Sequence, residues 1–301
     1  MSLMVLGVDD RSAPTSVREN LAFPGECRDR ALRALKSSFP DVEFVLLSTC
    51  NRVEVYVARA PSPPEIVELV SFVAQFHRMP EETVAEHFVV HKEEAAIGHL
   101  FRVAVGLESL VQDEDQIRGE VRDAYKAATG QGVVGPILNM TFHRALLAAK
   151  RARDETGLGR GSLSVAGIAV DLERARAIVE REAAGCWAAV RHRQAASVLL
   201  RQLGDRTEAT VRRELDRLFS AQRDLTEPQR AAIAQAMSRF LNQLLRHPRS
   251  ALPTATDAGG SADSHPVLDA ARRVFGLADG RPANHVNPRR AGDRRLAESL
   301  V

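Results

Sequence analysis

Short segments rich in apolar residues predict four strands in the first part of the chain. These segments are residues 3–8, 43–48, 53–58 and 87–91. Residues 53–58 alternate between apolar and polar side chains with the period of two that is typical of a strand. Helical spacing is found at residues 25–38, and a second helix is expected after Pro64, up to about His77. The resulting order, β-α-β-β-α-β, is that of a ferredoxin-like domain.

The next part of the chain has the apolar spacing of helices. Residues 93–128 and 138–155 predict helices that would be added to the small sheet. Residues 162–203 predict one long helix, because apolar residues recur there every three or four positions and proline is absent. Roughly 40 residues would make a rod about 60 Å long. Such a helix is too long to bury its apolar seam on a small domain, so we expect it to pack on a partner or on later helices.

Plainer helical patterns follow toward the C-terminus, at residues 208–220, 228–245 and 267–275. A segment rich in Pro, Gly and Ser precedes the last of these helices, and the tail beyond it is expected to be disordered. The sequence therefore predicts an α+β fold with a long spine helix and a helical C-terminal domain. The expected boundaries are 1–160 for the α+β domain, 161–203 for the spine helix, 204–278 for the helical domain and 279–301 for the tail.

Composition narrows the class of protein. Hydrophobic residues make up 45% of the 301 residues, yet no segment approaches the roughly 18 to 20 consecutive apolar residues of a membrane helix. The N-terminal residues carry no basic region, so we expect no secretory signal. The three cysteines, Cys27, Cys50 and Cys186, have neither the spacing of a disulfide framework nor that of a zinc site. These features predict a cytoplasmic, reduced protein with no membrane contact and no metal.

Charge gives little indication of a partner. Lys+Arg number 41 and Asp+Glu number 39, so the chain is nearly neutral overall. Basic residues cluster locally at Arg144, Lys150, Arg151 and Arg153. Such a run is usually a solvated helix face. Contact with nucleic-acid phosphates is the alternative, and it would make binding strongly dependent on salt concentration.

The segment with the clearest chemical character is Ser48-Thr49-Cys50-Asn51-Arg52, in the short connection between two predicted strands. A cysteine considered alone is more often a small buried hydrophobe. Here the neighbours are polar, and the cation Arg52 together with loop amides would favour the thiolate form of Cys50. The thiolate is the nucleophilic form of cysteine, so we expect Cys50 to be a nucleophile. Cys27 and Cys186 are expected to be structural.

The same segment, extended through Val53-Glu54-Val55-Tyr56, resembles the signature of the glutamyl-tRNA reductases, which begin the tRNA-dependent route to tetrapyrroles. Further blocks resemble the family in the same order along the chain. They are residues 7–21, His99-Leu100-Phe101-Arg102-Val103-Ala104, Gly106-Leu107-Glu108-Ser109-Leu110-Val111, Glu155-Thr156-Gly157-Leu158-Gly159, and a segment from about 174 to 278 that is similar to the family's dimerisation domain. The resemblance covers most of residues 1–278, and several spaced blocks in one order argue against a chance match.

The resemblance implies roles for particular residues. Cys50 would attack the ester that joins glutamate to tRNA, and His99 would be a second catalytic residue near the reacting centre. An arginine such as Arg52 can bind a carboxylate through two parallel hydrogen bonds. Apart from the resemblance, a lone histidine on a helix more often fills a core position. The residues that the resemblance places around the glutamyl group are Thr49, Arg52, Ser109, Glu114 and Gln116.

One domain of the family has no counterpart in the sequence. The resemblance implies a nicotinamide-binding Rossmann domain of roughly 150 residues between the long helix and the dimerisation helices. After residue 170 no alternation of strands and helices could form it. The segment Gly157-Leu158-Gly159-Arg160-Gly161 follows a helix and precedes no βαβ unit, so we reject it as a dinucleotide fingerprint. Hydride transfer requires a cofactor beside the thioester, so we expect no cofactor and no reduction.

Two segments depart from the family pattern near the expected substrate pocket. Asp9-Asp10-Arg11-Ser12 stands where the family usually has Asn-His-Lys-Thr. Gln112-Asp113-Glu114-Asp115-Gln116 stands where it usually has Leu-Gly-Glu-Pro-Gln. Acids in place of an asparagine and a histidine change the charge of the pocket. The identity of the amino acid, or of a second substrate, therefore stays open.

The sequence predicts an enzyme that transfers an acyl group from aminoacyl-tRNA, in the first place glutamyl-tRNA. Cys50 would form an aminoacyl thioester, and a small-molecule nucleophile would accept the acyl group without reduction by NADPH. Water as the acceptor would make the protein a deacylase. One alternative is a non-catalytic tRNA-binding or regulatory relative of the reductases, and another is reduction with a cofactor domain supplied in trans. The long helices predict a homodimer.

Overall fold

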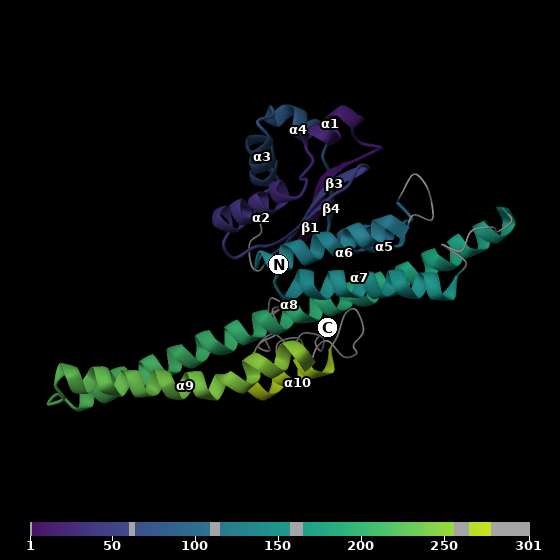
Figure 1. Cartoon of the computed structure of the whole chain (residues 1–301). Coiled ribbons are helices and arrows are strands. Elements are labelled where there is room, and N and C mark those ends of the chain that lie inside the picture. Colours follow the sequence, from purple (N-terminus) through teal and green to yellow (C-terminus); the bar gives the residue numbers. More distant parts are fainter. Residues whose placement is uncertain (1, 60–63, 109–114, 157–164, 256–264, 278–301) are drawn as a thin grey trace, which may run out of the picture. The chain divides into compact units, whose positions relative to one another are not determined.

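The computed structural model describes residues 2–59, 64–108, 115–156, 165–255 and 265–277 (Figure 1). The chain divides into two compact units, which are described separately. The first comprises Met1–Ala195 with Thr256–Asp263, and the second comprises Ala196–Ala255 with Ser264–Val301. The tail that we predict to be disordered, residues 279–301, lies outside the described residues, as does most of the link before the last helix.

The described part of the first unit contains one antiparallel sheet of four strands. They are β1 (Ser2–Asp9), β2 (Glu43–Ser48), β3 (Arg52–Arg59) and β4 (Val89–Lys92). Their order in the sheet is β2-β3-β1-β4, so β1 lies between β3 and β4 and pairs with both. Helices separate β1 from β2 and β3 from β4 along the chain. This is the predicted ferredoxin-like arrangement, and the α+β fold class is confirmed.

Helices cover both faces of this sheet (Figure 1). Those within the β-α-β-β-α-β order are α1 (Thr15–Asn20), α2 (Glu26–Ser38), α3 (Ile66–His77) and α4 (Glu81–His87). The added helices are α5 (Glu94–Val105), α6 (Asp115–Gly130) and α7 (Pro136–Glu155). The ring of Tyr56 on β3 packs edge-on against Phe142 of α7, with ring centroids 5.1 Å apart. The added helices therefore cover the sheet face from which Tyr56 projects.

Gly7 brings β1 unusually close to β3. The two strands pair over eight residues, from Ser2 opposite Arg59 to Asp9 opposite Arg52, and Gly7 lies opposite Glu54. A Cβ atom at position 7 would lie 2.0 Å from the main-chain oxygen of Val53. No larger residue fits without moving the backbone of β3, so this glycine sets the position of the strand that carries Glu54.

The helical stretch predicted at residues 93–128 contains two helices, α5 and α6. α5 ends at Val105, and Gly106 adopts a left-handed conformation with φ of 88°. The backbone N–H of Leu107 then donates to the carbonyl oxygen of Arg102 at 2.8 Å, which closes the helix end. Glycine pays no Cβ penalty at positive φ, so it commonly ends helices in this way.

Glu43, at the start of β2, caps the N-terminus of α7. Its two carboxylate oxygens accept hydrogen bonds from the backbone N–H groups of Ile137 at 3.2 Å and Leu138 at 2.7 Å. Gly135 leaves room for this contact, because a Cβ there would lie 2.5 Å from the Glu43 side chain. Burial raises the pKa of Glu43, and the backbone hydrogen bonds only partly offset this effect. The first N–H groups of a helix have no partner within it, so this carboxylate fastens α7 to the sheet.

In the first unit, α8 (Val165–Ala221) begins antiparallel to α7. The side chain of Arg144 donates to the carbonyl oxygen of Gly185 at 3.2 Å, and that of Arg193 donates to the carbonyl oxygen of Pro136 at 3.1 Å. Mostly small residues are buried along these two helices: Ala145, Ala148, Ala149, Ala152, Ala175, Ile178, Val179, Ala183, Cys186 and Val190. Part of the predicted apolar seam is therefore buried within the chain itself.

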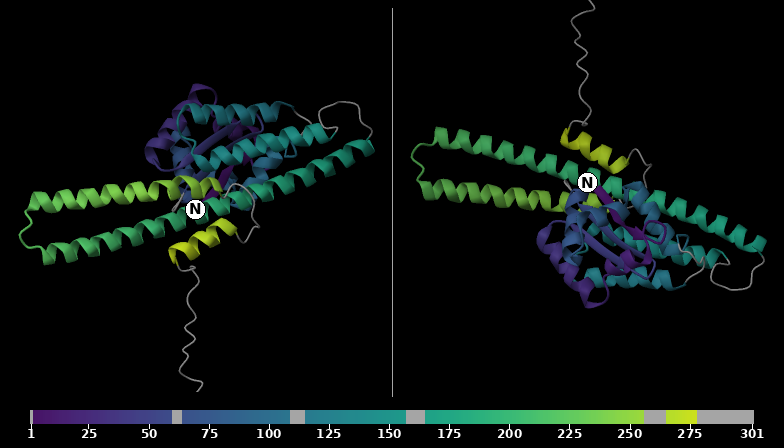
Figure 2. Two further views of the ribbon diagram at one scale, coloured as in Figure 1. Left: turned by 90° about the horizontal axis from the view of Figure 1, so that it is seen from below. Right: turned by 90° about the horizontal axis from the view of Figure 1, so that it is seen from above.

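The second unit contains the rest of α8 with α9 (Glu227–Ala255) and α10 (Pro266–Phe275). α8 continues to Ala221, so the predicted helix end near residue 203 and the separate helix at 208–220 are wrong. Gly204 lowers helix propensity by only about 1 kcal/mol, and no proline interrupts this stretch. Within the unit, α8 and α9 lie side by side (Figure 2). Among the described residues, no helix combines the length and apolar character needed to cross a membrane.

Candidate active site

The turn between β2 and β3 presents Cys50 to solvent. The backbone N–H of Thr49 donates to the carbonyl oxygen of Arg52 at 2.9 Å, and this bond closes the turn. The hydroxyl oxygen of Thr49 accepts hydrogen bonds from the backbone N–H groups of Asn51 and Arg52, each at 3.2 Å. Cys50 lies between Thr49 and Asn51, which these hydrogen bonds hold in place, and it is exposed. Its thiol can therefore meet a large substrate without any rearrangement of the sheet.

The three cysteines differ in their access to solvent. Cys50 is exposed, Cys27 is half-buried and Cys186 is buried. Burial raises the pKa of the Cys186 thiol to about 11, although Arg144 and a hydrogen bond with Thr141 act in the opposite direction. Since the thiolate is the nucleophilic form, the raised pKa and the burial of Cys186 both disfavour a nucleophilic role for it.

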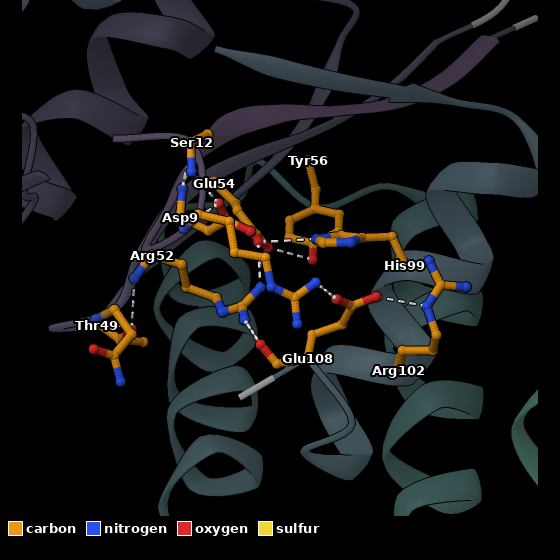
Figure 3. Close-up of polar contacts among 11 residues, drawn as sticks. Asp9, Ser12, Thr49, Arg52, Glu54, Tyr56, His99, Arg102 and Glu108 are labelled. Carbon is orange, nitrogen blue, oxygen red and sulfur yellow. Dashed lines mark hydrogen bonds and ion pairs between the residues drawn. The ribbon is translucent and has the colours of Figure 1, made fainter. Parts of the chain in front are cut away.

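Next to the turn, every second side chain of β3 from Arg52 to Tyr56 is polar and points into the protein, where Glu54 accepts hydrogen bonds from its neighbours (Figure 3). Oε1 of Glu54 accepts hydrogen bonds from Nη1 of Arg52 at 2.8 Å and from Nε2 of His99 at 2.9 Å. Oε2 accepts a hydrogen bond from the hydroxyl of Tyr56 at 2.7 Å. The side chains of Arg52 and Glu54 are only 1% and 5% exposed. We call Arg52, Glu54, Tyr56 and His99 the buried polar cluster.

The cluster holds Glu54 as a carboxylate. Burial alone would raise the pKa of Glu54, but the hydrogen bond and charge of His99, the charge of Arg52 and the Tyr56 hydroxyl together lower it to about 2. The pKa of Tyr56 rises well above its usual range, first because the phenol is buried and then because Glu54 is beside it. An ionised carboxylate only accepts hydrogen bonds, so the hydrogen between Glu54 and His99 lies on Nε2 of the imidazole.

His99 comes from α5 and is buried, and a second imidazole covers it. The ring of His91, on β4, stacks on that of His99 with centroids 4.6 Å apart and planes inclined by 19°. Burial lowers the pKa of His91, and the charges of His99 and Arg102 lower it further. His99 is thus fixed by a hydrogen bond at Nε2 and by stacking on its face.

A second set of charges surrounds Glu108, just after α5. Oε1 of Glu108 accepts a hydrogen bond from Nε of Arg102 at 2.6 Å, and Oε2 accepts one from Nη1 of Arg11 at 3.1 Å. The carbonyl oxygen of Glu108 accepts a hydrogen bond from Nη2 of Arg52 at 2.6 Å. Burial acts to raise the pKa of Glu108, but Arg102, His99 and Arg11 lower it below its ordinary value. This residue connects the exposed arginines to the buried polar cluster.

The predicted site residues are only partly brought together. Thr49 and Cys50 share the turn, while Arg52 and His99 meet through Glu54. Gln116 is exposed on α6, where its side chain donates to Glu120 at 2.9 Å. Ser109 and Glu114 lie outside the described residues.

The departure at position 9 has a structural role in the turn after β1. A carboxylate oxygen of Asp9 accepts hydrogen bonds from the backbone N–H groups of Arg11 at 3.0 Å and Ser12 at 2.9 Å. The hydroxyl of Ser12 in turn accepts one from the backbone N–H of Asp9 at 3.0 Å. Asp9 therefore shapes the turn after β1 and sets the position of Arg11.

Sequence reasoning did not identify Glu54, Tyr56, Arg102 or Glu108 as part of the site. A signal for the first two was present, because Arg52, Glu54 and Tyr56 recur with a period of two and must share one face of a strand. A face with three hydrogen-bonding side chains, opposite a face of valines, indicates a buried polar network. No comparable pattern marks Glu108, whose partners are 97, 56 and 6 residues away in sequence.

Two family models match this chain. "Glutamyl-tRNAGlu reductase, N-terminal domain" matches residues 6–156, and "Glutamyl-tRNAGlu reductase, dimerisation domain" matches residues 174–277. Only residues 157–173 lie between the two matched segments.

Curated relatives named glutamyl-tRNA reductase are similar over the same part of the chain. That of Chloroflexus aurantiacus is 42% identical over 181 residues, covering 58% of this chain and 42% of the relative. That of Pelobacter propionicus is 40% identical over 174 residues, covering 58% and 40%. That of Acaryochloris marina is 38% identical over 173 residues, covering 57% and 40%. The chain thus aligns with about two fifths of the length of these relatives.

The fold is also similar to a solved structure, the glutamyl-tRNA reductase from Methanopyrus kandleri. The TM-score is 0.51 at 17% sequence identity, with 91% of this chain and 99% of the other covered. At this identity the likeness concerns the fold alone. The family rests instead on the match to residues 6–156, which is half of the chain. From these matches we conclude that this chain belongs to the glutamyl-tRNA reductase family.

Proposed function

We propose that this protein takes the acyl group of an aminoacyl-tRNA, in the first place glutamyl-tRNA, onto Cys50 and passes it to a nucleophilic acceptor without reduction. The observation that carries the proposal is the exposure of Cys50 in a turn whose last residue, Arg52, enters the buried polar cluster. A reactive thiol must be accessible, and a positive charge nearby favours its thiolate. Relatives named glutamyl-tRNA reductase supply the class of substrate.

The proposed reaction has two steps without any change of oxidation state. In the first, the Cys50 thiolate attacks the carbonyl carbon of the aminoacyl ester, the bond from that carbon to the ribose oxygen breaks, and the ribose oxygen takes up a proton. In the second, an amine or hydroxyl acceptor attacks the thioester carbon, the carbon–sulfur bond breaks, and the acceptor loses its proton to solvent. Cys50 is regenerated as a thiolate, so the protein acts as a nucleophilic catalyst.

The other predicted site residues have supporting roles in this proposal. Thr49, Arg52, Ser109, Glu114 and Gln116 hold the glutamyl group, and His99 lies near the reacting centre. Arg52 already donates to Glu54 and to the carbonyl oxygen of Glu108. A guanidinium group has five N–H donors, so hydrogens remain for a substrate carboxylate, which must displace neighbouring groups to reach them because the side chain is only 1% exposed.

We propose that the thioester is not reduced, because too few residues lie between the two matched segments to form a nicotinamide-binding domain. A nicotinamide-binding domain of the kind expected there would need roughly 150 residues. Residues 157–173 separate the segments that match the N-terminal and dimerisation models. The thioester therefore leaves by transfer to an acceptor in this proposal. The match to a dimerisation model over residues 174–277 supports a homodimer as its active form.

The test is the formation of a covalent adduct on Cys50. Purified full-length chain incubated with glutamyl-tRNA is expected to gain the mass of one glutamyl group, which intact-mass spectrometry after an acid quench detects. Peptide mapping should locate the group on Cys50, and hydroxylamine should release it, as it does thioesters. Cys50→Ser should abolish the hydroxylamine-labile adduct.

Cys27→Ser is the matched control, because Cys27 is the other cysteine with access to solvent, and it should leave adduct formation unchanged. Absence of any adduct from glutamyl-tRNA or other charged tRNAs would rule out the catalytic proposal. If the protein still bound those tRNAs, the non-catalytic alternative would stand. An aldehyde product formed by the purified chain with NADPH would contradict the absence of reduction.

A further inference from the structure

Glu108 is a point of convergence for three arginines from separate parts of the chain. Its carbonyl oxygen accepts from Arg52 on β3, and its carboxylate accepts from Arg102 on α5 (Figure 3). The carboxylate also accepts from Arg11 in the turn after β1. The side chain of Glu108 is 16% exposed, whereas those of Arg11 and Arg102 are 63% and 40% exposed. Two arginines at the surface thus hold a residue that reaches the buried Arg52.

We infer that Glu108 is a positioning residue for Arg52: the two surface arginines fix its carboxylate, and its carbonyl oxygen then fixes one end of the Arg52 guanidinium. Glu54 holds the other end, since it accepts from Nη1 while Glu108 accepts from Nη2. A guanidinium with both terminal nitrogens held cannot rotate, so its remaining N–H groups have fixed directions. This inference deepens the proposed function and rests on it for its catalytic consequence.

The backbone around Glu108 explains how its side chain controls its carbonyl group. Gly106 turns the chain out of α5 with φ of 88°, and the N–H of Leu107 is bonded to the carbonyl oxygen of Arg102. Arg102 therefore holds this segment twice, through its main chain at Leu107 and through its side chain at Glu108. Among the described residues beyond the glycine, Arg102 and Arg11 hold the carboxylate, and these contacts orient the Glu108 peptide group toward Arg52.

Arg52 transmits this orientation to the Cys50 turn. Its backbone carbonyl oxygen and N–H group are both bonded to Thr49, on the opposite side of Cys50. The ends of β1 and β3 also meet here, because Asp9 pairs with Arg52 in the sheet. The turn with Cys50 and the turn with Arg11 consequently lie at the same end of the sheet. A change at Glu108 should therefore reach Cys50 through Arg52 without altering the apolar core.

The first experiment compares Glu108→Gln with the wild-type chain in single-turnover acylation of Cys50 by glutamyl-tRNA. We expect the limiting rate to fall about tenfold, while the tRNA concentration that gives half of this rate stays unchanged. Arg102→Met should cause a similar loss, and the double variant should be little slower than either single variant, because both changes act through one contact. Glu155→Gln, which removes the charge of an exposed glutamate on α7, is the matched control.

A second measurement follows Arg52 without any reaction. Restrained guanidinium groups give resolved signals for their terminal hydrogens in proton–nitrogen NMR spectra, and Arg52→Lys identifies those of Arg52. We expect these signals in the wild-type chain and in Glu155→Gln, and we expect them to be lost in Glu108→Gln at a temperature at which circular dichroism shows this variant to be folded.

Wild-type acylation by Glu108→Gln, or additive losses in the double variant, would overturn the catalytic part of the inference. Persistence of the restrained Arg52 signals in Glu108→Gln would overturn its structural part. If the wild-type chain forms no adduct at all, the proposed function fails, and the NMR result alone decides whether Glu108 positions Arg52.

Discussion

Two arginine–glutamate pairs in the first unit have nearly the same geometry and very different surroundings. Nη1 of Arg52 lies 2.8 Å from Glu54, and Nη1 of Arg151 lies 2.9 Å from Glu182. The first pair is 1% and 5% exposed, whereas the second is 49% and 35% exposed. Water screens the second pair, and its long side chains lose entropy when they are held together. Distance therefore says little about the energy of such a pair, and burial decides it.

The buried pair is also part of the buried polar cluster, whereas the exposed pair lies at the protein surface. Glu54 accepts hydrogen bonds from Arg52, His99 and Tyr56, so its charge is compensated inside the protein. Removal of one member would leave another charge buried without compensation, which costs far more than the attraction itself suggests. Arg151 can exchange either partner, Glu155 or Glu182, for water. The comparison predicts large effects for changes in the buried polar cluster and very small ones for changes in the exposed ion pairs of α7.

The largest effect is expected for Glu54→Gln. This change leaves the Arg52 guanidinium buried beside a neutral amide, and the free energy of unfolding should fall by about 3–5 kcal/mol. Urea denaturation followed by the fluorescence of Trp187, the single tryptophan of the chain, reports on the first unit. Glu155→Gln is the matched control, with the same chemical change on an exposed residue, and its unfolding midpoint should match the wild type. A fall of less than about 1 kcal/mol for Glu54→Gln would show that the cluster is not tightly coupled.

The second effect is a dependence of stability on acid. The pKa of Glu54 is lowered from 4.5 to about 2 in the folded protein. A lowered pKa contributes stability above the unfolded value, and this contribution is lost as the pH falls from about 4.5 toward 2. The loss should be on the order of 3 kcal/mol, and Glu108 adds to it in the same direction because its pKa is also lowered.

Urea denaturation at a series of pH values measures this dependence. In Glu54→Gln the decline between pH 4.5 and 2 should be much shallower than in the wild-type chain, since the titrating carboxyl is gone. Parallel curves for the two proteins over this range would contradict the low pKa of Glu54. Glu155→Gln should retain the full wild-type decline.

The sequence predicts the strands of the sheet well, because the residue pattern that marks each strand lies within the strand itself. Each strand is an apolar or alternating run with polar or proline-containing ends, so β2 is predicted at its observed bounds and the others to within about two residues. The helices are predicted less accurately. Gly106 ends α5, whereas Gly204 lies inside α8, and nothing in the two local sequences distinguishes these outcomes. The difference depends on the bond from Leu107 to Arg102, which requires the left-handed turn at Gly106.

The candidate site shows the same limit. The motif around Cys50 is contiguous in sequence, so the nucleophile and the turn could be predicted from it. The partners of Arg52 could not, because Glu54 is near in sequence but Glu108 is 56 residues away. Only the packing of α5 against the sheet brings them together. Glu43 and α7 provide a second case, since the capping carboxylate is 94 residues from Ile137. Contacts of this kind are set by tertiary structure rather than by local pattern.

The smallest effect on stability is expected for Arg151→Met, which tests the exposed pair of the comparison. The side chain of Arg151 is half exposed and pairs with Glu155 and Glu182, and these partners raise the pKa of its guanidinium. This raised pKa has no consequence for stability at neutral pH, because the arginine is charged in the folded and unfolded chains alike. Methionine keeps the length of the side chain and its helix propensity, so only the ion pairs are lost. We expect the urea midpoint reported by Trp187 to stay within the error of the measurement at low and high salt. If the midpoint of Arg151→Met fell below that of the wild type at low salt and matched it at high salt, α7 and α8 would be held together by charge. The buried alanines between the two helices would then contribute less stability than their burial indicates.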